Sequence, residues 1–279
     1  MYIYFYKALK NTDLTLLFLI TGIILFALTG ILFLCATLIK RKRKLIKQKK
    51  KQVYIEQIEA MLFALIFEQL TIKEVIAQYW AIPKDNLFKK LMIRSVVSLH
   101  QNYTGNQKLI LEQFYTKSDL SEYSLLKLRS IWWKHKVEGI RDLSALNVTD
   151  AIPEIRDALG HNNELVKKEA LIGLISLEGI TLMNQSEIDQ IDIDDWSQSC
   201  IIFNMKRKQQ TFPEDITYLL KSRNESLVLL AARIIDFFQL YTFYPALLQS
   251  GMQLTTVKHQ QDLARIKERI KTFISNEYD

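Results

Sequence analysis

Residues 14–39 read LTLLFLITGIILFALTGILFLCATLI, and residues 40–44 continue as KRKRK. The apolar stretch contains 26 residues, and its only ionisable side chain is the thiol of Cys35. A helix needs about 20 apolar residues to cross the hydrocarbon core of a bilayer. The stretch therefore predicts one transmembrane helix over residues 14–39, with length to spare for some tilt.

Two other interpretations of this stretch fit less well. A cleaved signal peptide has an apolar core of roughly 7–15 residues and a small-residue cleavage site. This stretch is longer, and cations follow it. A core helix of a soluble protein would need a polar face toward water, and about seven turns of this sequence offer none.

The positive charge of the chain is concentrated beside this stretch. The formal net charge is +7, and residues 40–51 contain nine Lys or Arg and no acid. Without those nine cations, the rest of the chain has a net charge of −2. Nucleic-acid affinity depends on many cationic contacts to phosphates, so a nucleic-acid partner is not expected.

Charge asymmetry also predicts the orientation of the helix. Residues 1–13 contain Lys7, Lys10 and Asp13, whereas the other flank contains nine cations. Cationic flanks stay on the cytoplasmic side. We therefore expect a short extracytoplasmic segment over residues 1–13, a cationic juxtamembrane segment over residues 40–52 and a cytoplasmic domain over residues 53–279. The membrane-proximal basic residues are Lys40, Arg41, Lys42, Arg43 and Lys44. They act as a stop-transfer signal or, alternatively, recognise anionic lipid head groups.

Behind the basic segment the sequence predicts an all-α domain. Only 8 Gly and 4 Pro interrupt the whole chain, and apolar residues recur at helical spacing. The expected helices cover residues 87–100, 107–114, 120–133 and 136–146, and an atypical helix pair is expected over residues 180–208.

The domain contains an internal repeat with an offset of 61 residues. The first series is Ile155, Leu159, Asn163, Val166, Ala170, Leu174 and Leu177. The second series is Ile216, Leu220, Asn224, Leu227, Ala231, Ile235 and Phe238. Each series predicts a short helix, a polar turn and a second helix that packs back. A small residue marks the closest backbone approach, and Ser95, Gly139, Ala170 and Ala231 are expected there. Such hairpins bury their apolar faces only by stacking on neighbours.

This pattern resembles HEAT repeats, most clearly over residues 151–171, AIPEIRDALGHNNELVKKEAL. The family usually has Asp and Arg where this chain has Asn163 and Lys167. The resemblance covers residues 87–238 and implies a HEAT-like α-α superhelix, or solenoid. It also implies a bacterial inner-membrane protein that binds a protein partner, such as an envelope-biogenesis enzyme. HEAT-like proteins include bilin lyases and a DNA glycosylase family, so an enzyme stays open, as does a membrane signalling adaptor.

No catalytic, cofactor or metal site is predicted. His100, His135, His161 and His259 have no partner at metal spacing, so helix-surface or turn positions are expected. Two cysteines, Cys35 and Cys200, suggest no disulfide framework. The acidic residues near position 190 are Glu187, Asp189, Asp192, Asp194 and Asp195. They lack the glycine and terminal glutamate of an EF-hand and are expected to cap a helix that starts near Trp196.

The predicted function is therefore a non-catalytic scaffold that binds a membrane-associated protein. Trp and Arg are enriched at binding hot spots, although core packing also explains adjacent indoles. The candidate partner-binding residues are Arg129, Trp132, Trp133, Lys134, Arg141 and Lys167.

Overall fold

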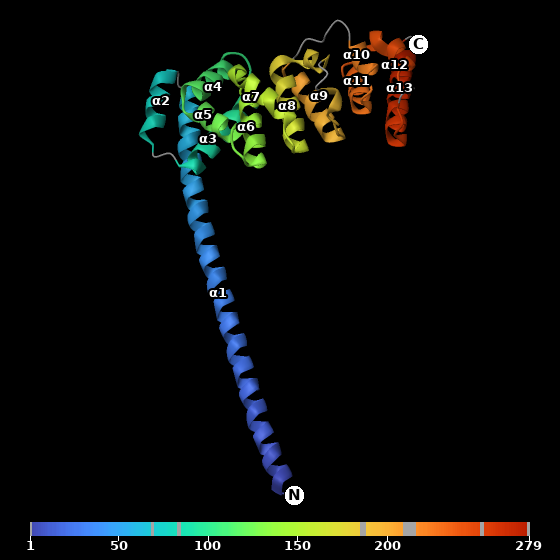
Figure 1. The fold of residues 1–279 in the computed structure, drawn as a ribbon. Helices are drawn as coiled ribbons and strands as arrows, with labels where there is room; N and C mark the ends of the chain where they lie inside the picture. The colour runs from blue at the N-terminus through green and yellow to red at the C-terminus, as the bar shows by residue number, and fades with distance from the viewer. Residues whose placement is uncertain are drawn as a thin grey trace. The chain divides into compact units, whose positions relative to one another are not determined.

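The computed structural model describes residues 2–67, 70–82, 85–184, 188–208, 216–251 and 254–277. Within these ranges every regular element is helical and none is a strand, which confirms the all-α prediction (Figure 1). The α-helices are α1 (Tyr2–Phe67), α2 (Ile72–Ala81), α3 (Asn86–Asn102), α4 (Asn106–Lys117), α5 (Leu120–Leu128), α6 (Trp133–Ala145), α7 (Ile152–Asp157), α8 (Glu164–Glu178), α9 (Asp195–Lys208), α10 (Thr217–Leu220), α11 (Glu225–Phe237), α12 (Tyr244–Gln249) and α13 (Val257–Glu277). Short 3₁₀ turns are η1 (Thr149–Ala151), η2 (Ala158–Gly160), η3 (Ile180–Asn184), η4 (Ile188–Gln190) and η5 (Tyr241–Phe243).

Helix α1 is long and apolar enough to cross a membrane, by length and composition. No residue in the most apolar stretch of α1 is buried, which argues against a core helix of a soluble domain. Thr21, Thr29 and Thr37 each donate their hydroxyl to a carbonyl one turn earlier, at 2.8–2.9 Å. These polar side chains are thereby satisfied within the helix itself. The side chains of Lys7, Lys10 and Asp13 lie outside the described part of the chain.

The chain divides into two compact units, residues 1–60 and 61–279. The second unit contains the last turns of α1 and all later helices. Its helices pack largely in chain order: α6 contacts both α5 and α8, α8 contacts α9, and α11 contacts α13. The core includes the aromatic side chains Tyr79, Phe88, Phe114 and Tyr115, all fully buried.

Two of the expected helices differ from the structure. The helix predicted over residues 120–133 is wrong, because α5 ends at Leu128 and Trp133 opens α6. The hydroxyl of Ser130 accepts a hydrogen bond from the Trp132 backbone N–H, 3.2 Å away, and stabilises the turn between them. Residues 180–208 form η3, η4 and the single helix α9 in place of a helix pair. Apolar spacing alone does not reveal such local hydrogen bonds.

The 61-residue repeat has a matching structure in its two copies. Asn163 caps α8 by accepting hydrogen bonds from Leu165 N (3.0 Å) and Val166 N (3.4 Å). Asn224 caps α11 in the same way, accepting from Ser226 N at 2.9 Å. The apolar members of the two repeat series are buried, from Ile155 to Leu174 in the first copy and from Ile216 to Ile235 in the second. Each copy is therefore a short helix, an Asn-capped turn and a longer buried helix.

Gly139 lies where α5 and α6 approach most closely, as its place in the repeat predicts. A Cβ at this position would lie 2.6 Å from Leu128 N and 2.7 Å from Ser124 O. Both are backbone atoms, so no side-chain rotation relieves the clash. The contact between α5 and α6 therefore requires glycine.

We expect Gly139→Ala to lower the free energy of unfolding by about 1–3 kcal/mol, because the added methyl group must push two helix backbones apart. Urea denaturation of the detergent-solubilised chain measures the change. Gly160→Ala is the matched control, since a Cβ there meets nothing within 4 Å. Equal losses in the two variants would contradict the assignment.

Candidate binding face around α9

The predicted partner-binding residues do not form one cluster. Arg129 pairs with Glu154 through Nε at 2.9 Å, and Lys167 pairs with Glu164 at 2.8 Å. The ammonium of Lys134 lies over the Trp133 ring, 5.4 Å from its centroid. The remaining indole, Trp132, is exposed in the turn before α6.

Arg141 does reach a groove. The α8–α9 groove has a volume of about 360 Å³ and is bordered by α3, α6, α8 and α9. Its lining residues are Val97, Gln101, Arg141, Asp142, Ser144, Ala145, Glu169, Ile172, Gly173, Ser176, Trp196, Cys200, Phe203, Asn204 and Arg207. The groove thus combines small apolar residues with cations and aromatic rings.

One rim of the groove is formed by Arg141. Its guanidinium binds both carboxylate oxygens of Glu169, which is 4% exposed. The hydrogen bonds that Glu169 accepts from this guanidinium, together with its negative charge, raise the pKa of Arg141. The same guanidinium lies over the Trp196 ring, 5.9 Å from its centroid. The ion pair fixes the cation beside an indole that is 55% exposed.

The other rim is formed by Arg207. Its guanidinium lies 5.9 Å from the centroid of the Phe203 ring, which is 61% exposed. Burial lowers the pKa of Arg207, and no ion pair to this side chain forms within the described residues. Trp196 and Phe203 are seven residues apart, so they lie on one face of α9. This face presents two uncovered rings, each beside a cation.

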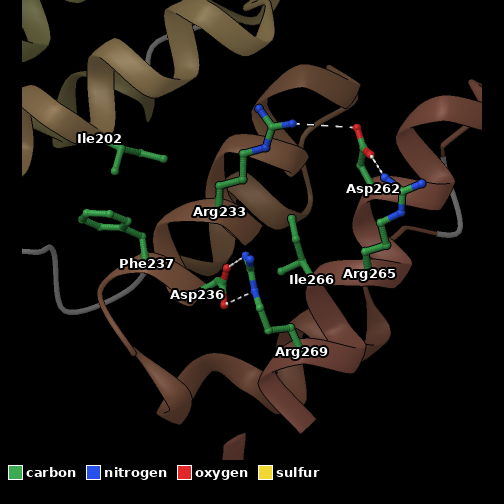
Figure 2. Close-up of a pocket in the computed structure, with 8 residues that line it drawn as sticks. All are labelled: Ile202, Arg233, Asp236, Phe237, Asp262, Arg265, Ile266 and Arg269. Carbon is green, nitrogen blue, oxygen red and sulfur yellow. Dashed lines mark hydrogen bonds and ion pairs between the residues drawn. The ribbon is translucent and has the colours of Figure 1, made fainter. Parts of the chain in front are cut away.

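A second cleft lies on the other side of α9, between α9, α11 and α13, and has a volume of about 460 Å³ (Figure 2). Arg233 and Arg265 both face Asp262, at 3.8 and 3.6 Å, and Arg269 binds both carboxylate oxygens of Asp236. Phe237 forms the apolar wall, and Lys206 lies over its ring at 5.4 Å. The arginines in this cleft are engaged by aspartates, unlike Arg207.

Of the acidic residues near position 190, Asp194 caps α9 as predicted. Asp194 accepts a hydrogen bond from Ser197 N at 2.8 Å and so caps the helix. A hydrogen bond from Lys168 lowers the pKa of Asp194 to about 2. Asp195 binds Arg233 and Lys258, each at 2.7 Å, and ties α9 to α11 and α13. Glu187 lies outside the described residues.

His100 corrects the expectation of a surface or turn histidine. It is buried, and its Nε2 lies 2.7 Å from Glu112 Oε1. A carboxylate on α4 satisfies the imidazole, so packing of α3 against α4 encloses it. His161 is a turn residue as expected, where its Nδ1 accepts from Asn163 N at 2.9 Å. Among the described residues, no group of three or more His, Cys, Asp or Glu could hold a metal ion.

Sequence reasoning missed Phe203, Arg207 and the arginines of the second cleft. The seven-residue spacing of Trp196 and Phe203, followed by the basic run 206–208, was a usable sign of a helix with an aromatic and basic face. No such pattern marks Arg233 and Arg269, because their neighbours come from other helices.

No protein-family model, curated protein or solved structure matches this chain.

A chain of part-buried polar side chains contacts the end of α9. Lys208 donates to Asn147 Oδ1 and to the Ser176 carbonyl oxygen, the latter at 2.6 Å. Asn147 in turn donates to Glu112, the partner of His100. Burial, reinforced by the cation of Arg207, lowers the pKa of Lys208 to about 8. The last turn of α9 thus contains a lysine whose pKa is lowered to about 8.

The lowered pKa predicts the pH dependence of stability. Between pH 8 and the ordinary lysine value of 10.5, the unfolded chain binds the Lys208 proton more tightly than the folded chain. Stability from this group therefore rises as pH increases through that window. We expect the free energy of unfolding of the unaltered chain to rise relative to Lys208→Met between these pH values, as measured by urea denaturation. Lys206→Met, which removes an exposed cation from the same turn, is the control. A constant difference between the unaltered chain and Lys208→Met would contradict the assignment.

Proposed function

We propose that this chain is a membrane-anchored scaffold that holds a helical segment of a protein partner in the α8–α9 groove. In this proposal α1 crosses the membrane, and the second unit is a HEAT-like superhelix on the cytoplasmic face. The matching Asn caps and buried positions of the two hairpins support the repeat architecture. Such stacks offer extended surfaces for binding proteins.

The observation that carries the proposal is the face of α9. Trp196 and Phe203 leave more than half of their surface in water, and Arg207 is half-buried without an ion pair in the described part of the chain. Exposed aromatic rings beside a desolvated arginine are typical of binding hot spots. Apolar anchors at helical spacing on a partner would fill the groove. An acidic residue among them would pair with Arg207.

The partner is therefore an amphipathic helix with at least one carboxylate on or beside its apolar face. A membrane protein is the natural source, because a shared membrane raises the effective concentration of the two chains. No bond is made or broken in this function. In this proposal the second unit binds the partner and holds it near the bilayer.

Photo-crosslinking tests the groove. We expect a benzophenone side chain in place of Phe203 to yield one discrete protein adduct in intact membranes. Arg207→Glu should lower the yield about tenfold, the equivalent of one lost charged contact of about 1.4 kcal/mol. Arg265→Glu, which reverses an exposed arginine in the second cleft, is the control and should preserve the adduct. The same adduct from a benzophenone at Phe273 on α13, or an adduct insensitive to Arg207→Glu, would overturn the proposal.

Reporter fusions test the membrane topology. Fused at the C-terminus, a green fluorescent protein should fluoresce and an alkaline phosphatase should be inactive, because the cations at 40–44 retain that side in the cytoplasm. Replacing Lys40, Arg41, Lys42, Arg43 and Lys44 with glutamine should increase phosphatase activity. An active phosphatase fused to the unaltered chain would contradict the proposed cytoplasmic location of the C-terminus.

A further inference from the structure

The turn between α5 and α6 exposes three large apolar side chains in succession. We refer to Ile131, Trp132 and Trp133 as the apolar tip. Their exposed fractions are 87%, 66% and 37%. None of them lines either of the grooves beside α9. The tip therefore leaves a contiguous apolar patch in water that the proposed partner site does not use.

The sequence around the apolar tip is basic. Residues 127–136 read KLRSIWWKHK, with four Lys or Arg, one His and no acid. Arg129 is neutralised by Glu154 across the turn. Lys134 instead covers the Trp133 ring, and within the described residues it forms no ion pair. Lys127 pairs with Asp142 at 2.8 Å, and its side chain is only 10% exposed. The cations beside the tip that no described carboxylate pairs with are therefore Lys134 and Lys136, and Lys136 donates to the Leu128 carbonyl oxygen at 3.0 Å.

We propose that the apolar tip enters the head-group region of an anionic bilayer, and that this bilayer is the one α1 is proposed to cross. Indole rings prefer the membrane–water interface, where the ring lies among apolar chains and the N–H meets water. Lysine beside them is attracted to anionic head groups. The sign of the charge matches that of residues 40–51, which flank the same membrane in the proposed topology.

Lipid quenching of tryptophan fluorescence tests this proposal, which rests on the membrane attachment proposed above. The full chain contains 4 Trp, and two paired variants separate them. Trp80→Phe with Trp196→Phe leaves only the indoles of the tip. Trp132→Phe with Trp133→Phe leaves Trp80 and Trp196, which are also exposed and serve as matched controls. Both variants are reconstituted in phosphatidylcholine–phosphatidylglycerol vesicles with or without bromine near the head of the acyl chains.

We expect brominated lipid to lower the emission of the tip-only variant at least about twofold and to leave the control variant nearly unchanged, because interfacial indoles contact the upper acyl chains. Replacing phosphatidylglycerol with phosphatidylcholine, or Lys134 with glutamine, should weaken the quenching. Equal quenching of both variants, or none in the tip-only variant, would overturn the proposal. A tip that binds a protein instead would stay unquenched in these purified vesicles.

Flotation of the same vesicles distinguishes the two proposals. A chain that fails to float with lipid disproves the membrane anchor. A chain that floats while its tip indoles stay unquenched disproves only the role of the tip. As a positive check, Ile131→Ser in the tip-only variant should reduce the quenching without changing flotation.

Discussion

The second unit depends on the burial of residues 169–176 of α8. All eight of these residues are buried, and α6, α7 and α9 pack against this helix. A helix segment buried in this way must be apolar around most of its circumference. The exceptions are few: the Glu169 carboxylate binds Arg141, and at Ser176 the main-chain carbonyl oxygen accepts a hydrogen bond from Lys208. The neighbours α6, α7 and α9 are positioned by their contacts with this one helix.

The α8–α9 groove follows from the same packing. Gly173, which lines the groove, allows α6 and α8 to approach closely, because a Cβ there would lie 3.0 Å from Ile140 Cγ2. Glu169 and Ser176, one turn to either side, hold Arg141 and Lys208 in place. Arg141, which lines the groove, is therefore positioned by a buried carboxylate of the core rather than by a flexible loop. This arrangement favours a preformed site, which reduces the entropy lost on binding.

Much of the fold was predictable from the sequence, and the site was predictable only in part. The apolar run at 14–39 and the repeat at Asn163 and Asn224 depend on local spacing, which a single sequence records. The break after Leu128 was missed because a serine hydroxyl, rather than a glycine or proline, shapes the turn. Arg141 was identified, but its indole neighbour Trp196 is 55 residues away. The groove depends on such distant pairs, which periodicity does not reveal.

The part-buried polar chain that links His100, Glu112, Asn147 and Lys208 affects the order in which the hairpins pack. Two hairpins with nearly the same apolar pattern could exchange places during folding, since apolar contacts tolerate many arrangements. Lys208 donates hydrogen bonds to a main-chain carbonyl oxygen on α8 and to the side-chain oxygen of Asn147. The side-chain nitrogen of Asn147 donates in turn to the Glu112 carboxylate on α4. A swapped order would deprive the part-buried ammonium of Lys208 and the part-buried carboxylate of Glu112 of these partners, which is unfavourable. The polar chain therefore favours the observed order of the hairpins.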